Sequence, residues 1–298
     1  MRLSRRAAMA FGAAGVAWMG APAMAQAMPA PSRFDLTGPG GRRITVTQWN
    51  PVGTPVGTVL FSHGAASAPH YYDLILGPVV AAGWRVLAPL HVDSREHPDT
   101  AHYPGLASWK ARLEDFAALT DHIGHVPYVA MGHSYGGLTA LVLGGAQSVP
   151  PPGWTGPQCD GKARAVIAFS PPPAIPVLIT KEGYGKLAVP AIIQTGTIDV
   201  MPGADPKEPE PWKAHLDAYE AAAPGGHRYG LVLEGVSHYF GGLICDFSQK
   251  GPPAVQGIKD ANRIAGLFLA AYGRGDHRAR VRLDAAVSPN LPVRLMMK

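Results

Sequence analysis

The sequence predicts an α/β fold in which a mostly parallel central sheet carries helices on both faces. Two observations lead to this prediction. Short apolar runs that are typical of buried strands alternate along the chain with longer segments whose apolar residues recur at helical spacing. Strands that are apolar throughout are typical of parallel sheets with both faces covered. The length of 298 residues suits one such domain with a full core.

A leader that is removed on export is predicted at the start of the chain. Three arginines within residues 1–6 precede a mildly apolar stretch, and Ala23-Met24-Ala25 has the small-x-small pattern of a cleavage site. The Arg5-Arg6 pair is typical of twin-arginine export. A membrane anchor is the alternative, but the stretch is short, rich in glycine and interrupted by Pro22.

We therefore expect a cleaved twin-arginine-type signal peptide over residues 1–25, a single domain over residues 26–298, and a periplasmic or secreted protein. The leader holds three basic and no acidic residues, so its removal lowers the formal net charge from +5 to +2. Residues 274–298 are basic, but no nucleic-acid motif or interleaved aromatic residues accompany them. We expect a solvated face there and no nucleic-acid partner. No other stretch is long and apolar enough to cross a bilayer.

The first half of the domain contains the elements that lead up to the central motif. Residues 26–41 are rich in Pro, Gly and Ala and are expected to form a loose lead-in. Residues 43–49 alternate between apolar and polar side chains, as an edge strand does. The other elements expected here are buried strands over 58–61 and 84–89 and helices over 71–82 and 106–124.

A polar loop follows the strand expected over 84–89, and it contains His91, His97 and His102. The spacing of these histidines matches no pattern of metal ligands, and histidines in loops are usually solvated. No metal site is therefore predicted.

The stretch Gly132-His133-Ser134-Tyr135-Gly136-Gly137 is the central motif. It reads G-x-S-x-G and lies between an apolar strand over 126–131 and an apolar helix over 138–143, which is the context of a nucleophile elbow. A serine at so tight a turn has a strained backbone, so its neighbours must lack side chains. The turn also places the hydroxyl at a helix N-terminus, where developing negative charge is favoured. Ser134 is the predicted nucleophile.

The second half of the domain supplies the partners of this serine. Strands are expected over 163–170, 189–195 and 229–234, and helices over 212–223 and 255–272. Asp199 follows the second of these strands and His238 follows the third. The order Ser134, Asp199, His238 is the order of nucleophile, acid and base in an α/β-hydrolase fold. Asp205, Asp217 and Glu234 are weaker candidates for the acid because they lie away from a strand exit.

An oxyanion hole is expected next to the serine. The buried strand over 58–61 ends in the loop Ser62-His63-Gly64-Ala65-Ala66, whose backbone can reach the site. Ala65 and Tyr135, the residue after the nucleophile, are the predicted oxyanion donors through their main-chain N–H groups. The alternative for His63-Gly64 is an ordinary turn between strand and helix. His133 is expected to lie below the elbow and to pack or hydrogen-bond there.

Residues 40–275 resemble α/β-hydrolases. Within that superfamily, several stretches resemble the platelet-activating-factor acetylhydrolase and dienelactone-hydrolase-like group, namely residues 61–64, Tyr72, residues 83–86, His91, Asp93 and residues 132–137. True dienelactone hydrolases have a cysteine nucleophile where this chain has Ser134, so the resemblance implies a serine esterase. Bacterial cutinases and polyester hydrolases are a related possibility, but they usually carry an aromatic residue where this chain has Pro171-Pro172-Pro173.

The sequence thus predicts an exported serine hydrolase that cleaves carboxyl esters of small molecules through Ser134, His238 and Asp199, without a cofactor. Two alternatives stay open. The same triad could act on amides, thioesters or polyesters, or the chain could be a catalytically inactive binding protein on this scaffold.

The two cysteines, Cys159 and Cys245, are even in number and belong to a chain with a predicted export signal. This combination favours a disulfide between them. The alternative is a pair of buried free thiols.

Overall fold

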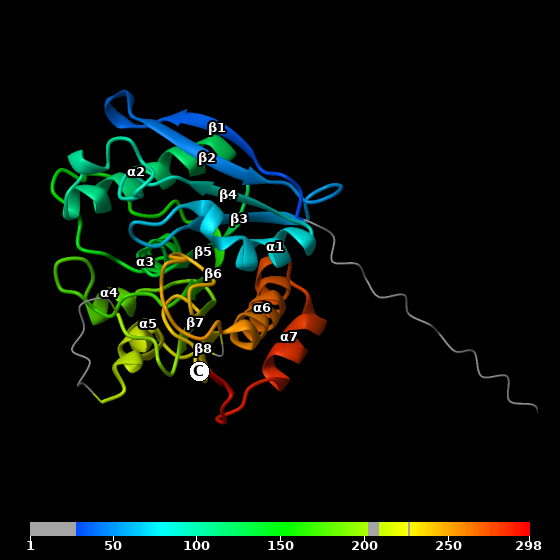
Figure 1. Cartoon of the computed structure of the whole chain (residues 1–298). Coiled ribbons are helices and arrows are strands. Elements are labelled where there is room, and N and C mark those ends of the chain that lie inside the picture. Colours follow the sequence, from blue (N-terminus) through cyan, green and yellow to red (C-terminus); the bar gives the residue numbers. More distant parts are fainter. Residues whose placement is uncertain (1–27, 202–208, 226) are drawn as a thin grey trace, which may run out of the picture.

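A nine-stranded sheet lies at the centre of the molecule, as Figure 1 shows for the part of the chain that is described. This computed structural model describes residues 28–201, 209–225 and 227–298, so the predicted leader lies outside the described residues. The strand order is β1-β2-β4-β3-β5-β6-β7-β8-β9. The bounds are β1 Ser32–Thr37, β2 Arg43–Trp49, β3 Gly57–Ser62, β4 Trp84–Pro89, β5 Tyr128–His133, β6 Ala163–Phe169, β7 Ala191–Gly196, β8 Arg228–Leu233 and β9 Val293–Met297.

The strands from β3 to β8 are parallel to one another, whereas β2 and β9 run antiparallel to their neighbours β4 and β8. The prediction of a mostly parallel sheet is therefore confirmed. Parallel strands place their carboxyl ends at one edge of the sheet, which is where ligands bind in folds of this kind. The loops that follow β3, β5, β7 and β8 thus meet at the same edge.

Helices cover both faces of the sheet. Figure 1 shows α1, α6 and α7 on one side and α2 to α5 on the other. The bounds are α1 Asp73–Ala81, α2 Leu106–Ile123, α3 Tyr135–Leu143, α4 Lys181–Tyr184, α5 Asp217–Ala221, α6 Val255–Phe268 and α7 His277–Ala285. Shorter turns are η1 Pro39–Gly41, η2 Pro69–Tyr72, η3 Thr100–His102, η4 Pro211–Leu216 and the π turn η5 Leu269–Gly273.

Two hydrophobic cores result, one on each face of the sheet. On β5, Val129 and Met131 belong to the core shared with α1 and α6, while Tyr128 and Ala130 belong to the core shared with α2 and α3. Successive side chains of a strand point to opposite faces, so a strand covered on both sides must be apolar throughout. This packing explains the continuous apolar runs in the sequence.

The structure differs from the sequence-based prediction at both edges of the sheet. β1 forms in the segment expected to be a loose lead-in, and it pairs with β2 over its whole length. β9 and α7 form in the basic C-terminal segment, where only a solvated face is expected. An edge strand has one neighbour only, and its formation depends on that distant partner, so local composition is a weak guide.

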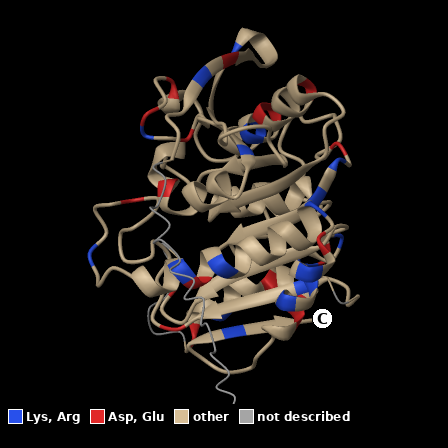
Figure 2. Cartoon of the chain, turned by 90° about the vertical axis from the view of Figure 1, so that its right-hand side faces the viewer, with Lys and Arg blue, Asp and Glu red and all other residues tan. Residues whose placement is uncertain are grey.

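Helix boundaries also shift. The helix expected over 71–82 begins as η2 before continuing as α1, and the helix expected over 212–223 divides into η4 and α5. Among the described residues, no helix is long and apolar enough to cross a membrane. Figure 2 shows basic and acidic residues interspersed over the elements that face the viewer.

Candidate active site

Ser134 lies where β5 passes directly into α3. Its backbone has φ 54° and ψ −124°, a combination that L residues rarely adopt, so the turn is strained as expected for a nucleophile elbow. The Ser134 N–H donates a hydrogen bond to the carbonyl oxygen of Phe169, 2.8 Å away, which fixes the turn against β6. The half-buried serine hydroxyl is thereby held at the carboxyl edge of the sheet.

The glycines around this turn are required by close backbone contacts. A Cβ atom on Gly136 would lie 2.0 Å from the carbonyl oxygen of Ser62 on β3. A Cβ atom on Gly132 would lie 2.1 Å from the carbonyl oxygen of Gly136. Both distances are far shorter than a van der Waals contact, so only glycine fits at either position. The close approach of α3 to β3 and β5 therefore explains the two glycines of the G-x-S-x-G pattern.

The structure brings the three predicted catalytic residues together. His238 Nε2 lies 3.0 Å from Ser134 Oγ, and His238 Nδ1 lies 2.8 Å from Asp199 Oδ1. Asp199 lies just after β7 and His238 just after β8, so neighbouring parallel strands deliver the two side chains to the same edge. Because Nδ1 faces the carboxylate and carries the hydrogen, Nε2 is free to accept the serine proton.

Asp199 is fully buried and is held by several groups besides His238. Its Oδ2 atom accepts hydrogen bonds from Ser170 Oγ at 2.6 Å and from Thr195 Oγ1 at 2.8 Å. Burial alone would raise the pKa of Asp199, but the contacts with His215 and His238 outweigh burial and hold the pKa well below its usual range. The acid is therefore ionised throughout the neutral range.

His215, from η4, is a second histidine at the same carboxylate. Its Nδ1 lies 2.7 Å from the carbonyl oxygen of Pro171 and so carries a hydrogen. Its Nε2 lies 3.1 Å from Asp199 Oδ1, so the two groups form an ion pair when the imidazole is protonated. Burial lowers the pKa of His215, but the Asp199 carboxylate outweighs burial and raises it overall. Sequence reasoning missed His215, Ser170 and Thr195 because no local pattern links them to Asp199.

The other candidates for the acid lie elsewhere. Asp217 Oδ1 is 3.1 Å from Lys181 Nζ and its Oδ2 accepts from the N–H of Ala174, while Glu234 is exposed. Asp205 lies outside the described residues. The structure thus pairs His238 with Asp199 alone among the candidates that are described.

His133 lies below the elbow and hydrogen-bonds there, as expected. It is fully buried, with Nδ1 3.0 Å from the hydroxyl of Tyr72 and Nε2 2.8 Å from the carbonyl oxygen of His238. The Tyr72 hydroxyl also accepts from the N–H of Gly64 at 2.8 Å. One chain of hydrogen bonds therefore joins the loop after β3, the elbow and the loop that carries His238.

The predicted oxyanion donors come from two separate segments. Ala65 lies in the loop after β3, and Tyr135 is the first residue of α3. Within the described part of the chain, neither main-chain N–H donates a hydrogen bond. Both groups are therefore available to an oxygen of a bound ligand.

The histidines of the loop after β4 differ from one another. His102 is exposed, but His91 is fully buried, with Nδ1 2.7 Å from Asp115 Oδ2 and Nε2 2.9 Å from Ser62 Oγ. The expectation of solvated histidines is therefore wrong for His91, because α2 packs over this loop. His97 is also buried.

Potential metal-ligand atoms come together at one place among the described residues, where those of Asp199, His215 and His238 all lie within 4.8 Å of one another. The hydrogen bond from His238 and the ion pair with His215 both engage Asp199 Oδ1, so an acid with two histidine partners accounts for this grouping.

The expected disulfide between Cys159 and Cys245 is wrong, because both residues are free thiols. Cys245 lies at the carboxyl edge of the sheet, where its carbonyl oxygen accepts from Ser67 Oγ at 2.8 Å. Cys159 lies at the opposite edge, because the adjacent Asp160 accepts a 2.8 Å hydrogen bond from the hydroxyl of Tyr128, the first residue of β5. A disulfide requires Cα atoms within about 7 Å of each other.

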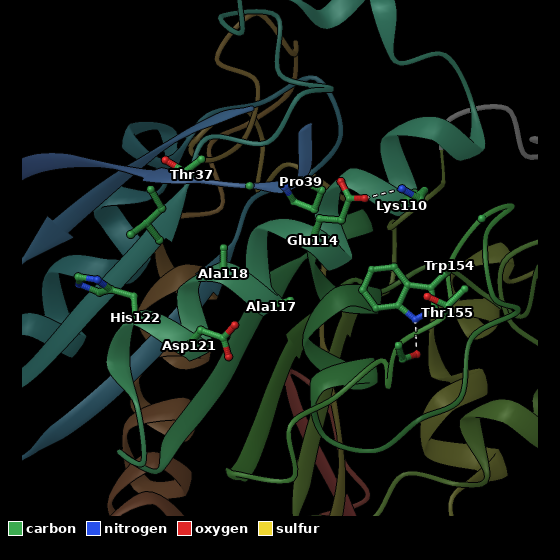
Figure 3. Close-up of a pocket in the computed structure, with 14 residues that line it drawn as sticks. Thr37, Pro39, Lys110, Glu114, Ala117, Ala118, Asp121, His122, Trp154 and Thr155 are labelled. Carbon is green, nitrogen blue, oxygen red and sulfur yellow. Dashed lines mark hydrogen bonds and ion pairs between the residues drawn. The ribbon is translucent and has the colours of Figure 1, made fainter. Parts of the chain in front are cut away.

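Two cavities differ in their relation to the site. A cavity of about 310 Å³ adjoins the loop after β3, and its lining includes Ala66, Tyr71, Arg95, Cys245 and Phe247. A larger one, of about 570 Å³, lies between α2, η1 and the loop that carries Trp154, and Figure 3 shows Lys110 paired with Glu114 along its wall. Neither cavity is lined by a residue of the triad, but the smaller one includes Ala66 of the loop after β3, and the larger one includes no residue of that loop.

Comparison with known proteins adds to this geometry. No family model matches the chain. A segment of 86 residues is 40% identical to the Mus musculus protein described as sn-1-specific diacylglycerol lipase ABHD11, which corresponds to 28% of this chain. The match covers 27% of the mouse protein, so the chain spans about a quarter of the length of the curated relative it matches.

Similarity in structure is more extensive. Esterase 2 of Thermogutta terrifontis, phosphoramylated by tabun, superimposes with a TM-score of 0.60 at 16% identity over 83% of this chain and 97% of the esterase. Dienelactone hydrolase from Anabaena variabilis gives 0.55 at 18% identity over 81% and 98%. The esterase domain of a Rhodothermus marinus protein gives 0.53 at 14% identity over 82% and 99%. Sheet topology, elbow and neighbours agree: the protein has the α/β-hydrolase fold.

Proposed function

We propose that this protein is an exported serine hydrolase that cleaves carboxyl esters through an acyl-enzyme intermediate. The observation that carries the proposal is the unbroken contact from Ser134 Oγ through His238 to Asp199, at 3.0 Å and 2.8 Å, with the serine on a strained turn. A hydroxyl is a weak nucleophile unless a base removes its proton, and this geometry supplies the base. The similar solved structures that are described as esterases support hydrolase activity. The substrates of those proteins are not assigned to this chain.

The chemistry follows from the placement of the three groups. His238 Nε2 takes the hydroxyl proton as Ser134 Oγ attacks the ester carbonyl carbon, and the carbonyl oxygen becomes an oxyanion. The ionised Asp199 stabilises the imidazolium that forms. The main-chain N–H groups of Ala65 and Tyr135 donate to the oxyanion. The C–O bond to the alcohol then breaks, and His238 gives its proton to the leaving alcohol. In the second half of the cycle His238 takes a proton from water, which attacks the acyl group, and then returns it to Ser134 Oγ as the acid is released.

Ester substrates are favoured over the alternatives on physical grounds. An alcohol is a better leaving group than an amine, so an ester demands less of the acid step than an amide does. The cavity of about 310 Å³ borders the loop that carries one proposed oxyanion donor, and a small acyl or alcohol group would fit there. The 86-residue match to a protein described as a diacylglycerol lipase also supports ester cleavage.

A panel of p-nitrophenyl esters with graded acyl length tests this proposal, with Ser134→Ala as the control. Loss of the nucleophile costs about 10⁶-fold in kcat in such triads. A variant that keeps half of the wild-type activity would show that another residue performs the attack. A catalytically inactive binding protein would hydrolyse no ester in the panel and would not react with a fluorophosphonate probe at Ser134.

We further propose export through the twin-arginine route, from the sequence of residues 1–25 alone. Expression of the full chain in a bacterial host, followed by N-terminal sequencing of the periplasmic protein, checks this. We expect a mature chain that begins near Ala25 or Ala27. Replacement of Arg5-Arg6 by Lys-Lys should retain the precursor in the cytoplasm. Full processing of that variant would contradict this route.

A further inference from the structure

The peptide group between Gly64 and Ala65 carries one of the two proposed oxyanion donors. Its C=O belongs to Gly64 and its N–H to Ala65, and in a planar trans peptide the two bonds point in opposite directions. Groups that hold the Gly64 carbonyl oxygen in place therefore also aim the Ala65 N–H. Gly64 is buried, so its carbonyl oxygen takes its hydrogen-bond donors from the protein and not from water.

Two side-chain donors and the main-chain N–H of Ser67, at 3.3 Å, converge on that carbonyl oxygen. His63 Nδ1 lies 2.7 Å from it and Arg112 Nη2 lies 3.3 Å from it. The tautomer of His63 is fixed, because its Nε2 accepts a 3.0 Å hydrogen bond from the main-chain N–H of His91. Nδ1 must then carry the hydrogen. Burial lowers the pKa of His63 well below its usual value, so the ring is neutral and holds this tautomer.

Several contacts fix the position of the Arg112 side chain. Its side chain comes from α2 and is fully buried. Asp93 binds it in a fork, with Nε to Oδ1 at 2.9 Å and Nη2 to Oδ2 at 2.8 Å. Its Nη1 donates to the carbonyl oxygen of His63 at 2.8 Å and to Ser62 Oγ at 3.1 Å. A bidentate pair of this kind leaves the guanidinium little freedom.

The same guanidinium also contacts the residue that carries the second proposed donor. Its central carbon lies 4.5 Å from the centre of the Tyr135 ring. Arg112 thus touches both segments whose N–H groups would bind the oxyanion. A buried guanidinium needs partners for the N–H groups that Asp93 leaves unpaired, and the loop after β3 supplies them through Ser62 Oγ and the carbonyl oxygens of His63 and Gly64.

We propose that Arg112 and His63 are positioning residues of the oxyanion hole, which aim and polarise the Gly64–Ala65 peptide from behind. This inference rests on the proposed function. A hydrogen bond from a cation to the carbonyl oxygen draws electron density through the amide and makes the N–H at its other end a stronger donor. A donor that is aimed before the reaction needs no reorganisation when the oxyanion forms.

The test compares Arg112→Met and Arg112→Lys with the wild type on a p-nitrophenyl ester. We expect Arg112→Met to lower kcat about 10- to 100-fold with KM changed less than about threefold, because the oxyanion exists only after attack. The inhibition constant of a trifluoromethyl ketone, whose adduct with Ser134 carries an oxyanion, should rise by a similar factor. Arg112→Lys keeps the charge but not the fork, so its kcat should fall between the two.

Arg228→Met is the matched control. Arg228 is also buried and donates to a carbonyl oxygen, that of Leu187 at 2.9 Å, but it lies on β8 away from the site. Assays are run below the melting temperature of every variant. Should Arg112→Met fail to fold, Arg112→Lys carries the test.

A wild-type kcat and inhibitor affinity in the folded Arg112 variants would overturn the inference. So would a fall in kcat no larger than in Arg228→Met. An inactive wild type that no fluorophosphonate labels would instead refute the proposed function itself, so the two failures are distinguishable.

Discussion

His133 donates a hydrogen bond from Nε2 to the main-chain carbonyl oxygen of His238, across 2.8 Å. The residue just before the proposed nucleophile thus holds the backbone of the proposed base. Burial lowers the pKa of His133 to about 3, so the ring stays neutral at any working pH. Its Nδ1 accepts from Tyr72, which leaves Nε2 as the permanent donor. The elbow therefore determines where the loop with His238 lies.

Replacement of His133 by Phe should disturb catalysis without removing a catalytic group. The carbonyl oxygen of His238 would lose its buried donor, which costs about 1–3 kcal/mol of stability. We expect a fall in kcat of about tenfold, because a small displacement of the base weakens its contact with Ser134. Urea unfolding and ester kinetics measure the two effects. The exposed His102→Phe is the control, and an equal change in both variants would refute the link.

Replacement of Asp199 by Asn should lower kcat by about 10⁴-fold while the chain stays folded, because an amide favours the wrong tautomer of the base. Ser170→Ala should cost far less, since Thr195 still donates to the same carboxylate oxygen. Steady-state kinetics on one ester rank the two variants. A Ser170 variant as impaired as the Asp199 variant would show that this hydroxyl has a larger role than orientation.

The contact between His215 and Asp199 predicts a pH-dependent contribution to stability. The groups that face His215 are Asp199, His238, His133 and Asp217. The pKa of His215 is raised in the folded state, so the folded chain binds this proton more tightly than the unfolded chain does. The stabilisation is thus complete below the unfolded value of about 6.5 and is lost as the pH rises through the raised folded pKa.

Urea unfolding of the wild type and His215→Gln between pH 5 and 9 measures this contribution. We expect the wild type to be more stable by about 1–3 kcal/mol at the acidic end and the difference to shrink toward the alkaline end. The exposed His277→Gln serves as the control and should show no such trend. A difference that grows with pH would mean that His215 is neutral in the folded state.

Substitution of glycine by alanine should have opposite effects on stability at the elbow and on α6. Gly136→Ala places a Cβ atom 2.0 Å from the carbonyl oxygen of Ser62, so α3 must move away from β3. We expect a loss of several kcal/mol, in the range of severe single substitutions. Gly266→Ala lies on an exposed face of α6 with nothing within 4 Å, so it should gain about 1 kcal/mol. Thermal melting of both variants checks the contrast.

The free cysteines predict two titratable thiols per chain. Cys159 and Cys245 lie at opposite edges of the sheet and are unbonded. The purified chain, denatured without reductant, should therefore react with two equivalents of a thiol reagent. A count near zero would mean that the cysteines pair after export, which would require a different position for at least one of the two loops.

Much of the candidate site could be predicted from the sequence, for a physical reason. Ser134 is marked by glycines that the close approach of α3 requires, and Gly132 and Gly136 lie on either side of it in the G-x-S-x-G pattern. Asp199 and His238 each lie in the loop that follows a buried strand. A parallel sheet brings the ends of its strands to one edge, so a residue at a strand exit can be placed there before the structure is known.

Contacts between distant segments were decided by the tertiary structure alone. Arg112 appears in the sequence as one charged residue on a helix, and only the packing of α2 buries it against the loop after β3. His215 reaches Asp199 because η4 packs against β7, and the two cysteines are separated by the whole length of the strands between them. The edge strands β1 and β9 form because β2 and β8 offer them unpaired backbone groups. The sequence by itself determines local features such as the glycines of the turn and the residues at the strand exits. These distant partners meet only when helices pack on both faces of the sheet, around hydrophobic cores that no single segment contains.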